Sequence, residues 1–206
     1  LSFLLLSIYC LSAANLKAGD TSAVVKSYFD KINQVEILIA EDSTEAFALM
    51  ESVDLRRTDV RDSLYLELVL SKLDVWQNNE FGDRLISEAN HLLQYSIAQN
   101  DLSTASSISN YLADYFLALN QLDSSYKHIE LAIDFQDSLE ATEKKGKLLL
   151  TKAAIYYAKN DYIRSIETVF EAVDQFQGSD QEMQMAFAYL QIGSTYLFIN
   201  YLDEAD

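Results

Sequence analysis

The stretch YYAKNDY at residues 156–162 decides the fold, because it belongs to a pattern that repeats along the chain. It begins with the aromatic Tyr156 and reaches an asparagine, Asn160, four positions later. The same combination recurs 40 residues before and 40 residues after it, and an aromatic residue extends the series one step further back. The members of this register are Trp76, Phe116 with Asn120, Tyr156 with Asn160, and Tyr196 with Asn200. A fixed period of this length predicts a helical repeat.

The composition favours helices over strands. The 206 residues include no Pro and only five Gly, so the residues that break helices and shape tight turns are scarce. Half of the residues (50%) are hydrophobic, which is enough to bury a sizeable core. We therefore predict an all-α protein.

Apolar residues recur at steps of three and four between residues 105 and 119, which is typical of one buried face of a helix. A second stripe follows Asn120, so the two stripes predict a helix pair. Asn suits such a junction because it tolerates the left-handed backbone conformation that ends a helix. Pairs of this kind are predicted at 61–98, 105–138, 146–177 and 183–206, the last with a second helix from Leu202, and further helices at 22–40 and 44–53.

Small residues share the register of the aromatic residues. They are Ala113, Ala153 and Gly193 on the first helix of three pairs, and Ser125, Ser165 and Ala205 on the second helix. Small side chains let two helices approach closely, so we expect these positions where paired helices meet. The four aromatic residues of the register are expected in equivalent buried sites.

These residues resemble the tetratricopeptide repeat, whose motif W-x2-L-G-x2-Y is followed by an alanine. The best match lies in the last pair, at Tyr189, Ile192, Gly193, Tyr196 and Ala205. The resemblance implies an α-α superhelix, a solenoid of antiparallel helix pairs. Two departures are a period of 40 instead of ~34 residues, and Asp137 and Gln177 where the family has proline. Residues 61–206 would then be repeats, the last one incomplete, and residues 15–60 a divergent or capping repeat.

In this family the first helix of each pair lines a concave groove that holds a peptide or a partner protein. The resemblance places these residues in the groove: Asn110, Tyr111, Asp114, Leu117, Leu150, Ala154, Tyr157, Leu190, Ser194, Leu197 and Phe198. The apolar members have an alternative role, which is packing between neighbouring repeats. The Lys and Asn clamp with which some relatives hold acidic chaperone tails is missing from these positions, so a chaperone co-factor role is not expected.

The sequence contains no recognisable catalytic or metal-binding constellation. His91 and His128 each lack a second His three or four residues away, so a helical metal pair is missing. The single cysteine, Cys10, excludes an internal disulfide framework and a cysteine-based zinc site. No glycine-rich loop precedes a helix, and no serine lies in a G-x-S-x-G elbow. We expect no catalytic residue, no metal and no cofactor in this segment.

The charge balance is strongly acidic. Lys and Arg total 15 against 32 Asp and Glu, which gives a formal net charge of −17. This charge repels phosphate backbones and anionic lipid head groups, and it argues against nucleic acid as a partner. Two interpretations of the acidity stay open: a solvated outer face that keeps the protein soluble, or an acidic docking patch.

The N-terminal sequence LSFLLLSIYCLSAAN is apolar on all sides and too short to span a bilayer. It matches the apolar region of a secretory signal, and residues 12–14 are small, as cleavage after Ala14 requires. Residues 1–14 are therefore predicted to be a signal peptide, and the mature protein is predicted to be exported to the periplasm. The alternative is a buried terminal helix. No later stretch is long and apolar enough for a membrane span.

Two functions fit these observations. The first is a non-catalytic, exported scaffold that binds a peptide or a partner protein. The second is the periplasmic sensory region of a bacterial signalling enzyme, because the chain resembles the repeat regions that precede diguanylate cyclase or histidine kinase modules. The catalytic module would then lie beyond residue 206. Because the last pair stops at Asp206, we also expect residues 183–206 to be mobile or to pair with a second copy.

Overall fold

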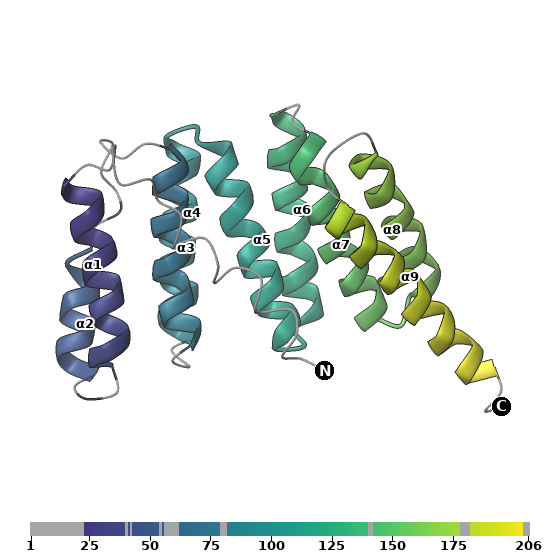
Figure 1. The fold of residues 1–206 in the computed structure, drawn as a ribbon, viewed down its shortest axis with the longest axis horizontal. Helices are drawn as coiled ribbons and strands as arrows, with labels where there is room; N and C mark the ends of the chain where they lie inside the picture. Colours follow the sequence, from purple (N-terminus) through teal and green to yellow (C-terminus); the bar gives the residue numbers. More distant parts are fainter. Residues whose placement is uncertain are drawn as a thin grey trace. The chain divides into compact units, whose positions relative to one another are not determined.

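The computed structural model describes residues 23–39, 41, 43–53, 55, 62–78, 82–139, 142–177 and 182–203. Within these residues it contains nine helices and no strand, which confirms the all-α prediction (Figure 1). The helices are α1 (Ala23–Leu38), α2 (Ser43–Glu51), α3 (Asp62–Asn78), α4 (Gly82–Ala98), α5 (Leu102–Ala118), α6 (Leu122–Ser138), α7 (Thr142–Ala158), α8 (Tyr162–Phe176) and α9 (Glu182–Asp203). The predicted signal peptide, residues 1–14, and the small residue Ala205 lie outside the described residues.

The helices follow one another at a regular step. From α3 onward they begin 20 residues apart, at residues 62, 82, 102, 122, 142, 162 and 182. α3 to α7 have 17 residues each and α8 has 15, so short connections complete each step. The 40-residue period of the sequence therefore corresponds to two helices with their connections.

Asparagine ends three of these helices. Asn100, Asn120 and Asn160 have φ angles of 59°, 58° and 61°, the left-handed conformation that Asn tolerates better than most residues. At the end of α5, the N–H groups of Asn120 and Gln121 donate to carbonyls of the last helical turn, over 2.9 and 2.8 Å. The same pair of bonds follows α7, so the predicted role of Asn120 and Asn160 is confirmed.

Asn200 does not end a helix, and the prediction for this residue is wrong. α9 runs without a break through Asn200, so no new helix begins at Leu202. At two of the three breaks the residue after the asparagine caps the next helix; at the third, Gln121 makes no side-chain cap. Asp101 and Asp161 cap the next helix by accepting a backbone N–H, at 3.0 and 3.2 Å, whereas Asn200 is followed by Tyr201, a residue type that does not cap helices.

Small residues bring the paired helices together, as expected. The hydroxyl of Ser125 on α6 donates to the carbonyl of Ala113 on α5 at 2.7 Å, and Ser165 on α8 donates to Ala153 on α7 at 2.9 Å. All four residues are completely buried. A larger side chain at either position would separate the helices and remove the bond, so the small residues determine the helix spacing.

The aromatic residues of the register differ in burial. Phe116 and Tyr156 are buried, with 9% and 8% of their surface exposed, and Trp76 is buried as well. Tyr196 is 50% exposed, and a Cβ added at the neighbouring Gly193 would meet open space. The prediction of a buried Tyr196 and a close helix approach at Gly193 is therefore wrong, because none of the described helices covers this side of α9.

By its internal contacts the chain divides into two compact units, residues 1–88 and 89–206, and the division falls inside α4. In the second unit, one buried cluster joins α5, α6 and α7, and another joins α7, α8 and α9. Their members are Ala113, Ile129, Ala132, Leu148 and Ile155 in the first, and Ala153, Val169, Val173, Ala188 and Ile192 in the second. This packing of helices in chain order is consistent with a helical solenoid; the superhelix itself stays a prediction.

A ladder of ion pairs joins α6 to α7. Three lysines lie seven residues apart, two on α7 and the third just after its end, and each pairs with a carboxylate of α6. The pairs are Lys145 with Asp137 (2.6 Å), Lys152 with Glu130 (2.8 Å) and Lys159 with Asp123 (2.9 Å). Exposed ion pairs stabilise a fold only slightly, but the ladder shows which side of α7 faces α6.

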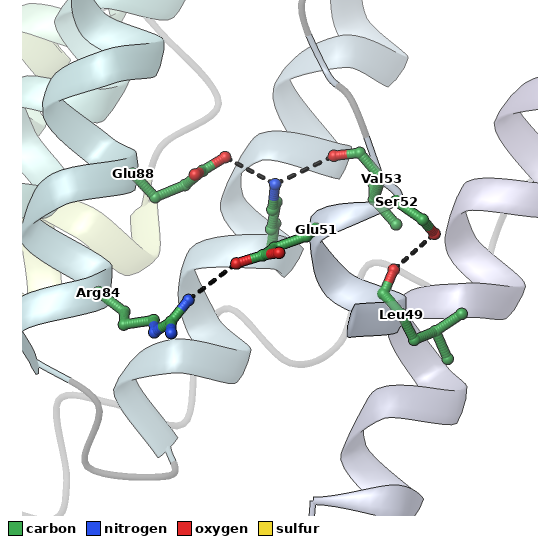
Figure 2. A network of polar contacts seen from close by, with 7 residues as sticks. Leu49, Glu51, Ser52, Val53, Arg84 and Glu88 are labelled. Carbon is green, nitrogen blue, oxygen red and sulfur yellow. Dashed lines mark hydrogen bonds and ion pairs between the residues drawn. The ribbon is translucent and has the colours of Figure 1, made fainter. Parts of the chain in front are cut away.

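In the first unit, the buried side chain of Lys72 on α3 connects two other segments (Figure 2). Its ammonium group donates to Glu88 Oε1 on α4 at 2.6 Å and to the carbonyl of Val53, just after α2, at 3.0 Å. A second ion pair, between Arg84 and Glu51 at 3.0 Å, is exposed on both sides (Figure 2). Burial makes the Lys72 contacts the more important ones, because an unpaired buried charge is costly.

Candidate binding surface

The residues that the structure describes hold no group of three or more His, Cys, Asp and Glu that could bind a metal ion. Their helices also include none that is long and apolar enough to cross a membrane. His91 is exposed on α4. His128 stacks on the ring of Phe116 with 5.4 Å between the ring centroids, and burial lowers the pKa of its imidazole. His128 therefore takes part in the packing of α6 on α5.

The eleven residues predicted to line a groove lie on α5, α7 and α9, and we call the surface that they form the first-helix face. None of the eleven is fully buried. Leu190 and Leu197 on α9 are the most open, with 68% and 73% of their surface exposed. Leu117 and Leu150 are half-buried and pack against the core clusters, which is the alternative role given to the apolar members.

A polar cluster occupies the part of this face where α5 and α7 meet. Asn110 Nδ2 donates to Asp114 Oδ2 at 3.2 Å, and the hydroxyl of Thr151 donates to Asp114 Oδ1 at the same distance. Asp114 keeps access to solvent, but protein atoms surround its carboxyl group closely. This desolvation raises the pKa of Asp114 to about 6, and the two hydrogen bonds oppose the rise.

An aromatic cluster occupies the same face further along α7. The rings of Tyr157 and Phe198, on α7 and α9, have their centroids 6.0 Å apart. Tyr162, at the start of α8, lies 5.5 Å from Tyr157 and 5.4 Å from Phe198. All three side chains stay partly exposed, so they offer apolar surface to a ligand.

Seven further residues of the predicted groove lie on the same three helices. They are Tyr111, Leu117, Leu150, Ala154, Leu190, Ser194 and Leu197. Ser194 donates its hydroxyl to the Gln191 carbonyl of its own helix at 2.9 Å. The role of these residues in binding stays a prediction.

Two members of the clusters were missed by the sequence reasoning. Thr151 lies 40 residues after Tyr111, so the repeat register could have identified it as a member of the face. Tyr162 lies on a second helix, and the register gives no such signal for it. It reaches the face only because its ring packs between Tyr157 and Phe198.

Another group of charged and aromatic side chains lies where α6, α7 and α8 meet. The hydroxyl oxygens of Tyr126 and Tyr156 are 3.2 Å apart, and this hydrogen bond raises the pKa of Tyr126 to about 12. Lys152 and Lys159 approach the Tyr126 ring at 6.0 and 5.1 Å, and Arg164 approaches the Tyr156 ring at 4.9 Å. Each cation is also paired with a carboxylate, so this group is neutralised within the chain.

Comparison with known proteins gives a fold but no family. No protein-family model matches the chain, and no curated protein matches it by sequence. Among solved structures, the chain is similar to BtubC (BKLC) from P. vanneervenii, with a TM-score of 0.60 and 13% sequence identity. The match covers 85% of this chain and 84% of BtubC. At this identity the likeness shows a shared all-helical fold alone.

Proposed function

We propose that this chain is a non-catalytic scaffold of the tetratricopeptide type, whose first-helix face binds an extended or helical segment of a partner protein. The observation that carries the proposal is the composition of that face. It presents a polar cluster and an aromatic cluster at the surface, and neither of them closes the core of the unit. Both clusters stay open to solvent, so their side chains are available to a ligand.

The tetratricopeptide assignment is supported by the spacing and the packing of the helices. Helices begin every 20 residues, asparagine ends α5 and α7 in the same conformation, and equivalent serines bond to equivalent alanines. The likeness to BtubC supports the helical fold. A repeated unit with these properties stacks on its neighbours and presents its first helices on one side.

A peptide segment suits the chemistry of the face. Tyrosine and phenylalanine are frequent among the residues that dominate binding energy, since their rings offer a large apolar area with few rotatable bonds. The rings of Tyr157, Tyr162 and Phe198 would cover an apolar side chain of the ligand. The Ser125 and Ser165 bonds hold the helix pairs in place, which lowers the entropy that binding costs.

Selection from a library of displayed random peptides tests the proposal. The complete chain is compared with two variants that each add one positive charge: Ala154→Arg, which introduces a long side chain on the first-helix face, and Gln177→Arg at the exposed end of α8. We expect the wild-type chain and Gln177→Arg to select the same peptides, and Ala154→Arg to lose them. A selection that yields no peptide, or peptides that Ala154→Arg binds equally well, would rule out the proposed surface.

A further inference from the structure

We propose that the cluster of Asn110, Asp114 and Thr151 receives a basic side chain of the bound peptide, and that Tyr157, Tyr162 and Phe198 receive an apolar side chain of the same peptide. The inference rests on the proposed function and specifies the ligand class of that surface. Its ligand is an extended segment that carries a lysine or arginine close to an apolar residue.

The first argument is that Asp114 has only neutral partners. Its two oxygens accept one hydrogen bond each, from an amide and from a hydroxyl, both at 3.2 Å. A carboxylate offers about four acceptor sites, so this one retains capacity for further donors. Among the ion pairs of the described residues, none includes Asp114. A guanidinium or ammonium group would supply both the missing charge and the missing donors.

The lysines of α7 make this difference clear. Lys145 and Lys152 on α7, and Lys159 just after it, pair with carboxylates of α6. Lys144 on α7 donates to the Ser103 hydroxyl on α5 at 3.0 Å. None of these lysines pairs with Asp114, which receives only the hydroxyl of Thr151 from α7.

The second argument is the position of the Asn110 amide. Asn110 donates its Nδ2 hydrogen to Asp114, and this orientation leaves its Oδ1 buried without a hydrogen-bond partner. An unpaired buried carbonyl oxygen is unfavourable, because it has lost its hydrogen bonds to water. Asn110 therefore holds Asp114 in place at a cost to stability, which is expected where the geometry of a site is maintained for a ligand. The raised pKa of Asp114 agrees, since a carboxyl group without a cation is poorly solvated there.

The third argument is the distance between the two clusters. Thr151 and Tyr157 lie six residues apart on α7, which is roughly 9 Å along the helix axis and about 120° around it. An extended peptide needs about three residues for the axial distance alone. We therefore expect the basic and the apolar residue of the ligand to be about three or more positions apart. The net charge of −17 would also attract a basic segment from a distance.

The test uses the peptides selected by the complete chain. We expect them to share a Lys or Arg about three or more positions from an apolar residue. Asp114→Asn should weaken binding of such a peptide by about 10- to 100-fold, as for a lost charge-assisted hydrogen bond. Asp134→Asn, which removes the charge of an exposed aspartate on α6, is the matched control and should change the affinity less than about twofold.

A double-mutant cycle separates direct contact from a structural effect. When the basic residue of the peptide is replaced by Gln, Asp114→Asn should have little further effect. Selected peptides without a basic residue, or an effect of Asp114→Asn that persists with the Gln peptide, would overturn this inference while the proposed binding surface stands. A library that yields no peptide at all would overturn both.

Discussion

The carboxyl group of Asp114 lies at a crowded part of the surface, where protein atoms displace water from it. No cation of the described residues pairs with it. Its pKa is raised to about 6 from an ordinary value of 3.8, with desolvation as the main cause. A raised pKa means that the folded state favours the protonated form. This contribution to stability is present below pH 4 and is lost as the pH rises through about 6.

The first prediction follows from the direction of this pKa shift. Asp114→Asn removes the titration, so the wild-type chain should lose stability relative to the variant between pH 4 and pH 7 in the absence of ligand. Urea unfolding of both proteins at four pH values across this range measures the difference, and Asp134→Asn controls for the loss of one negative charge. A difference in unfolding free energy that stays constant with pH would contradict the assigned environment of Asp114.

Lys72 gives a second prediction at the scale of single residues. Lys72→Met keeps most of the side-chain volume but leaves the carbonyl of Val53 without its donor and Glu88 without its cation. We expect a loss of about 1–3 kcal/mol in the unfolding free energy. Arg84→Met, which breaks the exposed pair with Glu51, should cost less than about 1 kcal/mol. Equal losses in urea unfolding would mean that Lys72 is not a stabilising buried connection between Glu88 and Val53.

At the scale of helices, α7 organises the second unit because it contacts its neighbours with three different sides. Its lysines pair with α6, Ala153 accepts the Ser165 hydroxyl from α8, and Thr151 reaches Asp114 on α5. Near its start, Gly146 makes a close approach: a Cβ added there would overlap the ring of Phe176, which is completely buried. The absence of a side chain at Gly146 thus determines how closely α7 and α8 pack at this end.

The two helical glycines allow a matched comparison. Gly146→Ala should destabilise the protein by about 1–3 kcal/mol through overpacking, in spite of the better helix propensity of Ala. Gly193→Ala on α9 meets open space and should stabilise by about 0.5–1 kcal/mol. Urea unfolding of the two variants measures both changes in stability. A Gly146→Ala protein at least as stable as the wild type would show that α7 and α8 do not approach each other as described.

Tyr156 and Tyr196 occupy equivalent positions of the 40-residue repeat and allow a second matched comparison. Tyr156 is buried between α7 and its neighbours and bonds to Tyr126, whereas Tyr196 is half exposed. We expect Tyr156→Ala to cost about 3–5 kcal/mol. Tyr196→Ala should cost less than about 1 kcal/mol, since its ring contributes little to the described core. A Tyr156→Ala protein that unfolds at the same urea concentration as the wild type would disprove the assignment of the inner side of α7.

At the scale of the whole molecule, the repeat made much of the fold predictable. Periodicity and the lack of Pro gave the helices, and Asn120 and Asn160 gave two of the turns, because these features act locally. Burial is different, since it depends on whether another helix covers the residue. The register alone therefore placed Tyr196 and Gly193 in a core that the described helices do not form.

The proposed binding surface was predictable only in part for the same reason. Asn110 and Asp114 lie four residues apart on one helix, so their proximity follows from helix geometry. Thr151 shares the register of Tyr111, so the sequence could have placed it on the face. Tyr162 enters its cluster through contacts between different helices, which a single sequence does not reveal. The pairing of Lys145 and Lys152 with α6 also depends on helix packing, which the sequence alone does not give.

Photo-cross-linking of a selected peptide to the complete chain tests the central claim, a binding surface over α5, α7 and α9, most directly. The peptide carries a photoreactive leucine analogue at its apolar position, and mass spectrometry identifies the residues that it labels. We predict labelling of Tyr157, Tyr162 and Phe198, and its loss in Ala154→Arg but not in Gln177→Arg. Labelling confined to α6 or to α8 beyond Arg164 would contradict the claim.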